Sequence, residues 1–249
     1  MGGAPRTDYD ALADSYDADR ERFDIPPDDV IARTQPRSVL DVGCGTGLWL
    51  AAQSRHYPAA RIAWAGLDLS AGMLRQAARK DLPVRLVRAT AERIPFTDSA
   101  FDYVFSGYVY HHFEDKLAAF DEIARIVRPG GIFRIRHMDS FNKQDWWIYR
   151  YFPRTREIDA KRFWPTDKLA AAIRERGFAV DAVLNTEADT STKQDVIEVA
   201  QRRVTSQLAV LDDESYEIGM RRLRDLPDDA TFETSRGASL TLTATKLSF

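Results

Sequence analysis

The sequence predicts an α/β protein built around a doubly wound sheet, and three observations lead to this fold class. Short apolar segments alternate with amphipathic helical segments between residues 39 and 184. The first apolar segment runs directly into a glycine-rich turn at residues 43–47, and a helical segment follows. The second ends on Asp68, about 20 residues farther along, which is the spacing of one turn, one helix and one strand. Strands separated by helices become parallel neighbours, so the turn and Asp68 should share one edge of the sheet.

The composition fits a single domain with an embellishment. The chain has 249 residues, 44% of them hydrophobic, which is enough to bury one large core. A formal net charge of −3 gives no general attraction to nucleic acid, and a single cysteine, Cys44, excludes an internal disulfide. The start of the chain lacks an apolar leader, and no run approaches the ~20 apolar residues that span a bilayer. We therefore expect a cytoplasmic monomer or homodimer without membrane contact.

The first elements follow the periodicity of their apolar residues. Tyr9, Leu12 and Tyr16 recur at helical spacing, and Pro26-Pro27 opens a second helix. Residues 1–35 should therefore form a helical segment ahead of the first strand. Beyond it we expect strands at 39–42, 61–68, 84–88, 100–106 and 132–138, and helices at 48–56, 70–78 and 115–127.

The chain changes character at residues 140–165. Eight aromatic residues are crowded there among charges, with Pro153 and Pro165 as breaks. A connector seldom carries so many rings unless they pack over something, so we expect an inserted cap. After it the patterns predict a helix at 166–177, a strand at 178–184, a polar loop at 185–193, helical faces at 196–211 and 216–223, and a closing strand at 238–247.

The glycine turn predicts a ligand site. Gly43, Gly45 and Gly47 allow backbone angles that a Cβ forbids, and the helix after them offers unpaired N–H groups to an acceptor. A nucleotide triphosphate loop would need Lys and then Ser or Thr where Leu48 and Trp49 stand. A dinucleotide fingerprint would place its third glycine at Leu48 and would usually end its strand on an apolar residue. Both phosphate-binding interpretations are disfavoured.

The stretch from Val39 to Gly47, with Asp41 ahead of three alternating glycines, resembles the first motif of the class I S-adenosylmethionine (SAM)-dependent methyltransferases. Asp68, residues 89–92 and the turn at 128–131 also resemble features that this family has farther along its chain. The resemblance implies a seven-stranded Rossmann-like sheet of order 3-2-1-4-5-7-6 whose last strand is antiparallel. It also implies one methyltransferase domain over 1–249, with residues 1–35 as a lid and 140–165 as an aromatic substrate cap.

The resemblance further implies which residues hold SAM. The glycine loop would wrap the methionyl part, and Asp68 would accept hydrogen bonds from the ribose hydroxyls. Thr90 stands where the family often has an aspartate that binds the adenine amino group, and a hydroxyl is a weaker acceptor than a carboxylate. The implied cofactor-binding residues are Tyr16, Arg20, Asp41, Gly43, Gly45, Gly47, Asp68, Leu69, Met73, Thr90, Ala91, Glu92 and Ser106.

The loop at residues 107–113 should approach the methyl acceptor. It lacks the Asn- or Asp-Pro-Pro-aromatic tetrad of amino methyltransferases that act on nucleic-acid bases. His111 and His112 offer imidazoles that take a proton near neutral pH, which suits a general base acting on a hydroxyl. No metal-ligand spacing accompanies them. The expected substrate contacts, whose rings favour an apolar or aromatic acceptor, are His137, Trp146, Trp147 and Tyr151.

These observations predict transfer of a methyl group from SAM to a small apolar or aromatic metabolite or natural-product intermediate. Two alternatives keep the SAM site. One is a cyclisation or elimination that uses the sulfonium charge, and the other is a non-catalytic binding module whose cap is an interface. A nicotinamide oxidoreductase is disfavoured by Asp41 and Leu48. Methyl transfer is an in-line displacement that needs few obligatory side chains, so the sequence leaves the acceptor atom open.

Overall fold

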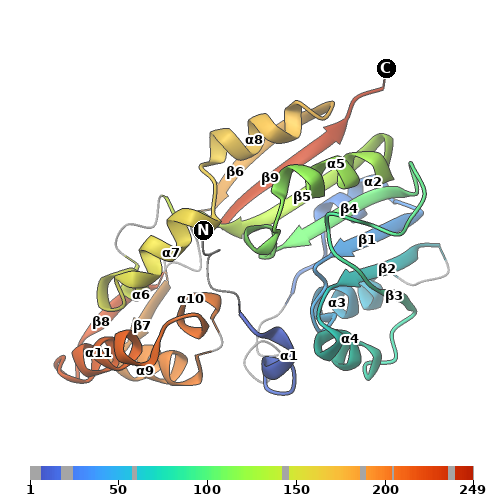
Figure 1. Ribbon diagram of the computed structural model, residues 1–249. Helices are drawn as coiled ribbons and strands as arrows, with labels where there is room; N and C mark the ends of the chain where they lie inside the picture. The colour runs from blue at the N-terminus through green and yellow to red at the C-terminus, as the bar shows by residue number, and fades with distance from the viewer. Residues whose placement is uncertain are drawn as a thin grey trace. The chain divides into compact units, whose positions relative to one another are not determined.

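The computed structural model describes residues 7–17, 25–57, 61–141, 146–185, 189–203, 205–234 and 239–248, and Figure 1 shows their course. The chain divides into two compact units. The first, here called the sheet unit, comprises Asp8–His137, Asp167–Ala182 and Thr241–Phe249. The second, the helical unit, comprises Met1–Thr7, Met138–Thr166 and Val183–Leu240.

A seven-stranded sheet of order β3-β2-β1-β4-β5-β9-β6 forms the centre of the sheet unit. β1 pairs in parallel with β2 and β4, β2 with β3, and β4 with β5. The arrow of β9 runs against that of β5 in Figure 1. Because β9 is the seventh strand of this sheet along the chain, the expected strand order is confirmed. The strands are β1 (Ser38–Val42), β2 (Ala63–Asp68), β3 (Val84–Arg88), β4 (Phe101–Gly107), β5 (Val127–Met138), β6 (Phe178–Asn185) and β9 (Ser239–Lys246).

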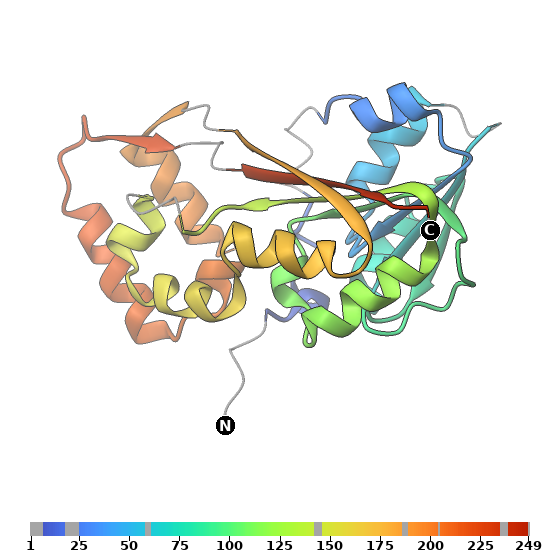
Figure 2. The same ribbon diagram turned by 90° about the horizontal axis from the view of Figure 1, so that it is seen from above.

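Helices cover both faces of this sheet. Figure 2 shows α2 and α3 on one face and α5 and α8 on the other. Several begin at capping residues, as when Ser70 Oγ accepts a hydrogen bond from the N–H of Met73 at the start of α4. The helices are α1 (Tyr9–Leu12), α2 (Asp29–Thr34), α3 (Leu48–His56), α4 (Ala71–Ala78), α5 (Lys116–Ile126) and α8 (Thr166–Arg174), with a short 3₁₀ helix, η1 (Tyr110–His112).

The carboxyl ends of β1, β2 and β4 meet at one edge of the sheet. Asp41 in β1 is level with Gly66 in β2 and with Phe105 in β4. The N–H of Ala89 donates to the carbonyl of Asp68 (3.1 Å), which brings the loop after β3 to the same place. This edge is where ligands of open parallel sheets bind.

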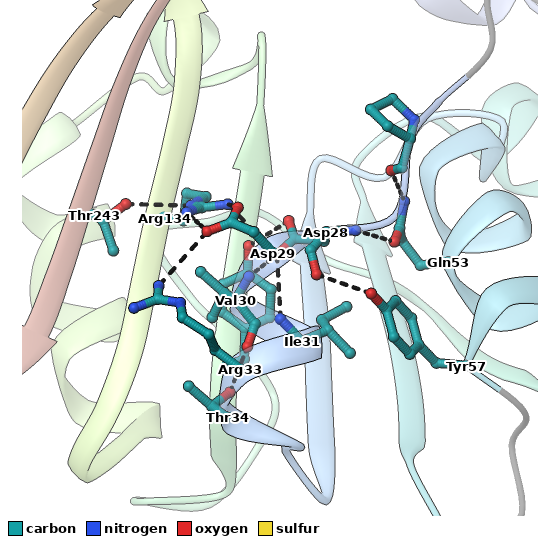
Figure 3. A network of polar contacts seen from close by, with 12 residues as sticks. Asp28, Asp29, Val30, Ile31, Arg33, Thr34, Gln53, Tyr57, Arg134 and Thr243 are labelled. Atoms are coloured by element: carbon teal, nitrogen blue, oxygen red, sulfur yellow. Dashed lines mark hydrogen bonds and ion pairs between the residues drawn. The ribbon is translucent and has the colours of Figure 1, made fainter.

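A polar network fixes α2 against the sheet (Figure 3). The guanidinium of Arg134 in β5 donates to both carboxylate oxygens of Asp29 (2.6 and 3.1 Å) and to Thr243 Oγ1 in β9 (3.2 Å). The hydroxyl of Tyr103 in β4 donates to Asp28 Oδ2 at 2.9 Å. The hydrogen bond from Arg134 holds the pKa of Asp29 below its usual value. This network therefore ties the segment before β1 to three strands.

The helical unit has its own core. Trp147, Tyr149 and Phe152 pack there with apolar residues of α9, α10 and α11. The ring of Phe152 stacks on Tyr216 with the centroids 6.0 Å apart. The predicted aromatic insertion is thus one part of a helical core whose other part comes from residues 196–232. The elements of this unit are α6 (Trp147–Tyr151), α7 (Arg154–Arg162), α9 (Lys193–Arg202), α10 (Ser206–Ala209), α11 (Asp213–Arg224) and the antiparallel pair β7 (Asp189–Thr192) and β8 (Thr231–Thr234).

Several element boundaries differ from the sequence prediction. β5 begins at Val127, because Phe101 of β4 already pairs with Val127, and a β-irregularity follows before Tyr103. Residues 13–17 are turns and do not continue α1. The expected polar loop at 185–193 contains β7, a short threonine-rich strand without the apolar alternation that marks a strand in sequence. The expected helical face at 196–211 belongs to two helices, α9 and α10.

Candidate cofactor site

The glycine loop is folded as a turn at the carboxyl end of β1. Gly43, Gly45 and Gly47 all adopt left-handed angles, with φ of 76°, 55° and 77°. The N–H groups of Gly43 and Cys44 donate to the carbonyl of Leu67 (2.7 and 2.9 Å), which anchors the loop on β2. Gly47 is the N-cap of α3. The structure thus brings the three predicted glycines together at the expected edge.

Gly43 and Gly45 are surrounded differently. A Cβ added to Gly43 would lie 2.4 Å from Val109 Cγ2, so this glycine is required by the packing of the loop after β4. A Cβ added to Gly45 would meet none of the described atoms within 4 Å. The space beside Gly45 is therefore open to a ligand that approaches the main chain closely.

Asp68 is positioned to bind both the loop and a ligand. Its Oδ2 accepts a hydrogen bond from the N–H of Gly45 (2.8 Å), and its Oδ1 accepts one from the N–H of Ser70 (2.9 Å). Burial raises the pKa of this carboxyl, against the opposing effect of the backbone N–H groups of Ser70, Gly45 and Leu69. A carboxylate has about four lone-pair positions, so about one remains for a hydroxyl donor.

Asp41 and Ser106 are buried polar residues at the same edge. Asp41 is 3% exposed, and burial together with the charge of Asp68 raises its pKa well above the usual value. Among the described residues none donates a hydrogen bond to its carboxylate. Ser106, at the end of β4, is 1% exposed, and its Oγ lacks a hydrogen-bond partner within the described part of the chain. Buried polar groups of this kind usually form hydrogen bonds with a ligand or a water molecule.

The residues assigned to the adenine side lie around the end of β2. Leu69 is 55% exposed, which is unusual for a leucine and leaves its side chain open to an apolar ring. Thr90 is half-buried in the loop that Ala89 ties to Asp68. Met73 is 1% exposed and belongs to the packed interior. Contact of these three residues with a cofactor remains a prediction.

The loop at 91–92 also has structural roles. Ala91 is buried. Glu92 Oε1 accepts hydrogen bonds from the N–H groups of Glu114 (2.7 Å) and Asp115 (3.3 Å), just before α5. These bonds account for part of the acceptor capacity of Glu92, and its predicted contact with the cofactor remains untested.

Two aspartates that the sequence analysis missed hold the N-terminal segment on the site. Asp10 Oδ1 accepts hydrogen bonds from Ser70 Oγ (2.7 Å) and from the N–H of Gly72 (2.5 Å), which lower the pKa of Asp10. Asp17 accepts a hydrogen bond from Thr46 of the glycine loop and pairs with Lys80. Both contacts join distant parts of the chain, so no local spacing revealed them.

The predicted N-terminal cofactor contacts are only partly described. Tyr16 is half-buried, and its ring centroid lies 6.1 Å from that of Tyr9. Arg20 lies outside the described residues. The role of both residues at the cofactor remains a prediction.

The histidines predicted for catalysis form an aromatic cluster with two tyrosines. The hydroxyl of Tyr9 lies 2.8 Å from His112 Nε2, and the rings of His111 and His112 are 3.9 Å apart. His111 is 7% exposed, whereas His112 is half-buried. His137 is 2% exposed, with its ring 4.6 Å from that of Tyr110. The structure therefore brings the three predicted histidines into one cluster of the sheet unit.

Tyr108 is a further candidate that the sequence analysis did not select. It follows β4 directly, is 52% exposed, and adopts a left-handed φ of 58°. Such an angle is strained for an aromatic residue, and strain of this kind concentrates at functional sites. No sequence pattern predicts the left-handed angle of Tyr108, because glycine or asparagine is the residue expected at such an angle.

The other three predicted substrate residues lie in the helical unit. Trp147 is 5% exposed and is part of the core of that unit. Trp146 and Tyr151 are partly buried and pack against the same core. This packing accounts for much of their burial, and contact with a substrate remains a prediction.

Comparison with known proteins agrees with the fold and the loop. Residues 40–135 match the family model of the methyltransferase domain. The malonyl-(acyl-carrier protein) O-methyltransferase of Pseudescherichia vulneris is 35% identical over 126 residues, 49% of this chain and 49% of that protein. The demethylmenaquinone methyltransferase of Staphylococcus aureus is 38% identical over 97 residues, 37% of this chain and 39% of that protein. The chain thus spans half or less of the length of these relatives.

A solved structure matches nearly the whole chain. It is a putative methyltransferase from an antibiotic biosynthesis pathway of Anabaena variabilis, with a TM-score of 0.66 and 20% identity over 97% of this chain and 99% of that one. The family match over residues 40–135, the strand order and the glycine loop agree with the fold of the class I SAM-dependent methyltransferases. Of the helices in the described ranges, none is long and apolar enough to span a membrane. Those ranges also contain no group of three His, Cys, Asp or Glu side chains arranged to hold a metal ion.

Proposed function

We propose that this protein transfers the methyl group of SAM to a small apolar or aromatic molecule. The observation that carries the proposal is the open space beside Gly45, which a Cβ would occupy, in a loop that Asp68 holds through its hydrogen bond from the Gly45 N–H. An extended ligand that approaches the main chain there suits the methionyl part of SAM.

The chemistry of the neighbouring side chains fits the rest of SAM. The remaining acceptor capacity of Asp68 would serve a ribose hydroxyl, and the exposed side chain of Leu69 would lie against the adenine. Asp41 would supply a negative charge for the cationic end of SAM, since its carboxylate has no donor among the described residues. When SAM is bound, its sulfonium supplies an activated methyl group.

The acceptor would be aligned near the loop after β4. If the acceptor is a hydroxyl, His112 is our candidate base. Its neutral ring accepts a proton only at the nitrogen without hydrogen, and Tyr9 faces Nε2 at 2.8 Å. An acceptor hydroxyl would therefore either replace Tyr9 at Nε2 or pass its proton through the Tyr9 hydroxyl. His111, which is more deeply buried, is the second candidate.

The acceptor is proposed only as a class of molecule. By their names, the two relatives act on a malonyl group carried by acyl-carrier protein and on demethylmenaquinone. Each matches half of this chain or less, so neither acceptor is carried over. The small-molecule class is supported instead by the loop at 107–113, which lacks the tetrad of the base-modifying enzymes.

Calorimetric titration with SAM, followed by turnover with a panel of small hydroxyl, amine and activated-carbon acceptors, tests this proposal. We expect saturable SAM binding and, with the right acceptor, release of S-adenosylhomocysteine together with a product one methyl group heavier. Absence of SAM binding would contradict the proposal. A product of unchanged mass, formed without S-adenosylhomocysteine, would instead assign the non-methylating chemistry.

The histidine assignment is tested with His111→Ala and His112→Ala on an identified hydroxyl acceptor. A positioned base typically contributes about 10²–10⁴-fold to the rate, so one of the two variants should lose turnover in that range while its SAM affinity stays unchanged. Tyr9→Phe should alter the pH profile of turnover if the proton passes through the tyrosine hydroxyl. Normal turnover in both histidine variants would show that neither histidine is the catalytic base.

A further inference from the structure

The N-terminal segment, residues 8–17, contacts the rest of the sheet unit through three aspartates. Asp10 lies in α1, and Asp14 and Asp17 follow it at spacings of four and three residues. Of residues 8–17 only Ala13 is buried. The attachment of this segment therefore depends more on polar contacts than on a buried apolar core.

Asp10 contacts the residues that follow Asp68. Its Oδ1 accepts hydrogen bonds from Ser70 Oγ (2.7 Å) and from the N–H of Gly72 (2.5 Å). The N–H of Ser70 in turn donates to Asp68 Oδ1 at 2.9 Å. A Cβ added to Gly72 would lie 3.1 Å from the Cα of Asp10 and 2.9 Å from its Oδ1, so a glycine permits this close approach. Asp10 therefore helps to fix the main chain that orients the carboxylate of Asp68.

Asp17 makes a similar contact with the glycine loop. Its Oδ1 accepts a hydrogen bond from Thr46 Oγ1 at 2.5 Å, and its Oδ2 pairs with Lys80 Nζ. Thr46 is buried and stands between Gly45 and Gly47. The side chains of Asp17 and Lys80 are both mostly buried, so solvent screens their ion pair less than a surface pair. Asp17 therefore holds a side chain at the centre of the glycine loop.

Asp14 has different surroundings. Its Oδ1 accepts a hydrogen bond from Gln76 Nε2 at 2.5 Å and lies 3.9 Å from Arg79 Nη1. The side chain of Asp14 is 92% exposed, and an exposed pair of this kind contributes little free energy. Asp14 thus shares the charge and the segment of the other two aspartates, but its partners in the described ranges lie on the surface of α4 and at its end.

The two contacts from Asp10 and Asp17 reach the two loops of the candidate cofactor site. Those loops are already joined, because Asp68 Oδ2 accepts the hydrogen bond from the N–H of Gly45. A loop that is held in its binding conformation loses less conformational entropy when the ligand arrives. Contacts that fix Thr46 and Ser70 in the ligand-free protein therefore favour binding without touching the ligand.

The N-terminal segment leaves the space beside Gly45 open. Apart from its chain neighbours, none of the described atoms lies within 4 Å of a Cβ added to Gly45. The acceptors of Asp10 and Asp17 are used by Ser70, Gly72, Thr46 and Lys80, and not by the N–H groups of Gly43, Cys44 and Gly45. The segment thus holds the loops in place without filling the position predicted for the ligand.

We propose that Asp10 and Asp17 are positioning residues for SAM. They hold Ser70 and Thr46, and through them the two cofactor loops, in the binding conformation, so that the N-terminal segment sets the affinity for SAM. The identity of the ligand rests on the proposed function, whereas the ordering of the two loops does not.

Amide hydrogen exchange of the ligand-free, full-length protein tests the ordering of the loops. Asp17→Ala should speed exchange at residues 43–47 by about tenfold, and Asp10→Ala should do the same at residues 69–73. Asp14→Ala is the matched control and should leave both stretches unchanged. Unchanged exchange in the Asp10 and Asp17 variants would overturn the proposal, and so would equal acceleration in all three variants.

Calorimetric titration with SAM measures the effect on affinity. Asp10→Ala and Asp17→Ala should each weaken SAM binding by about tenfold, whereas Asp14→Ala should bind SAM as the unaltered protein does. Asp10→Asn should recover most of the affinity, because its amide oxygen accepts the same two hydrogen bonds. Unchanged affinity in folded Asp10→Ala and Asp17→Ala would contradict the proposal. Tighter binding would show that the segment obstructs the site, and would also contradict it.

A second variant isolates the hydrogen bond of Asp17 from its ion pair. Thr46→Val keeps the shape of the side chain and leaves Lys80 paired, so it should reproduce the loss of SAM affinity that Asp17→Ala causes. The double variant should lose no more than the larger single loss, because both changes remove the same hydrogen bond. Losses that add would show that Asp17 and Thr46 act independently, against the proposal.

The two kinds of measurement separate this inference from the proposed function. If the unaltered protein did not bind SAM but Asp10→Ala and Asp17→Ala changed the exchange as expected, the proposed function would fail and the ordering of the loops would stand. If the unaltered protein bound SAM and the two variants matched it in exchange and affinity, only the positioning role would fail.

Discussion

Two buried carboxylates, one in each unit, differ in the hydrogen bonds that they accept. Asp41 in the sheet unit is 3% exposed and receives no hydrogen bond from the described residues, and burial raises its pKa. Asp159 in the helical unit is 1% exposed and accepts three hydrogen bonds, one of them from the cation Arg162. Their burial is nearly equal, so the difference lies in the donors around them.

This difference separates a binding role from a structural role. A carboxylate supplied with donors holds its neighbours in place, and removing it leaves those donors buried without a partner. A carboxylate buried without donors costs folding free energy until a ligand supplies them, which is common at functional sites. The comparison predicts that Asp159 matters for stability and that the groups around Asp41 matter for SAM.

The largest expected effect is on stability. Asp159→Ala should lower the free energy of unfolding by about 3–5 kcal/mol, because it leaves Arg162 as an uncompensated buried charge. Urea denaturation followed by tryptophan fluorescence measures this change. SAM affinity should be retained under conditions in which the variant is folded. Asp213→Ala is the matched control, since Asp213 pairs with Arg203 but is 92% exposed, and it should have little effect. Equal stability of the two variants would contradict the structural role of Asp159.

The next effect concerns Gly45. Gly45→Val should lower SAM affinity by about a hundredfold or more, close to 3 kcal/mol, because its side chain would fill the open space of the loop. The control is Gly130→Val, whose glycine also has a left-handed φ, 75°, and open space at the Cβ position. Both variants carry the backbone strain, so their stabilities should fall alike. Full SAM affinity in a folded Gly45→Val protein would show that the glycine loop does not bind SAM.

A smaller effect is expected at Asp68. Asp68→Ala should weaken SAM binding by about 1.5–3 kcal/mol, the usual range for hydrogen bonds to a charged group. Asp98→Ala is a suitable control, because Asp98 is an exposed carboxylate that pairs with Arg125. Calorimetry measures both variants. An unaltered dissociation constant for Asp68→Ala would mean that the ribose binds elsewhere.

The smallest effect is a dependence on pH. Burial raises the pKa of Asp41 and Asp68, so the folded protein without ligand keeps these protons to a higher pH than the unfolded chain does. Their contribution to stability is therefore greatest at low pH and is lost as the pH rises through the raised values. SAM favours the ionised carboxylates, so its affinity should increase with pH over the same window, from about pH 4 upward.

Thermal unfolding with and without SAM, measured at several pH values, checks this expectation. The stabilisation by SAM should increase with pH and then reach a plateau, and Asp41→Asn should reduce the dependence. Stabilisation that decreases as the pH rises would show that neither carboxylate faces the positive charge of SAM.

The elements of the sheet unit around the glycine loop are determined by patterns within short stretches of chain, and for that reason they could be predicted from the sequence. A strand followed by three alternating glycines and a helix capped by Ser70 are both indicated by neighbouring residues alone. The contacts of Asp10 with Ser70 and of Asp17 with Thr46 were missed, because they join residues 60 and 29 positions apart. No spacing rule covers contacts of that kind.

The helical unit was harder to predict for a different reason. The aromatic rings of residues 147–152 are visible in the sequence, but their partners on α9, α10 and α11 lie about 50 to 70 residues farther along, and the pairing depends on tertiary packing. The pair of Asp159 and Arg162 has ordinary helical spacing and looks like a solvated pair in sequence. Only the burial of both side chains shows otherwise.

Amide hydrogen exchange of the full-length protein with and without SAM tests the central claim most directly. The account predicts slower exchange, on adding SAM, in the glycine loop at 43–47 and in residues 67–73, with no change in α9 and α11. Protection restricted to the helical unit, or no change at residues 43–47 at saturating SAM, would contradict the assignment of the cofactor site.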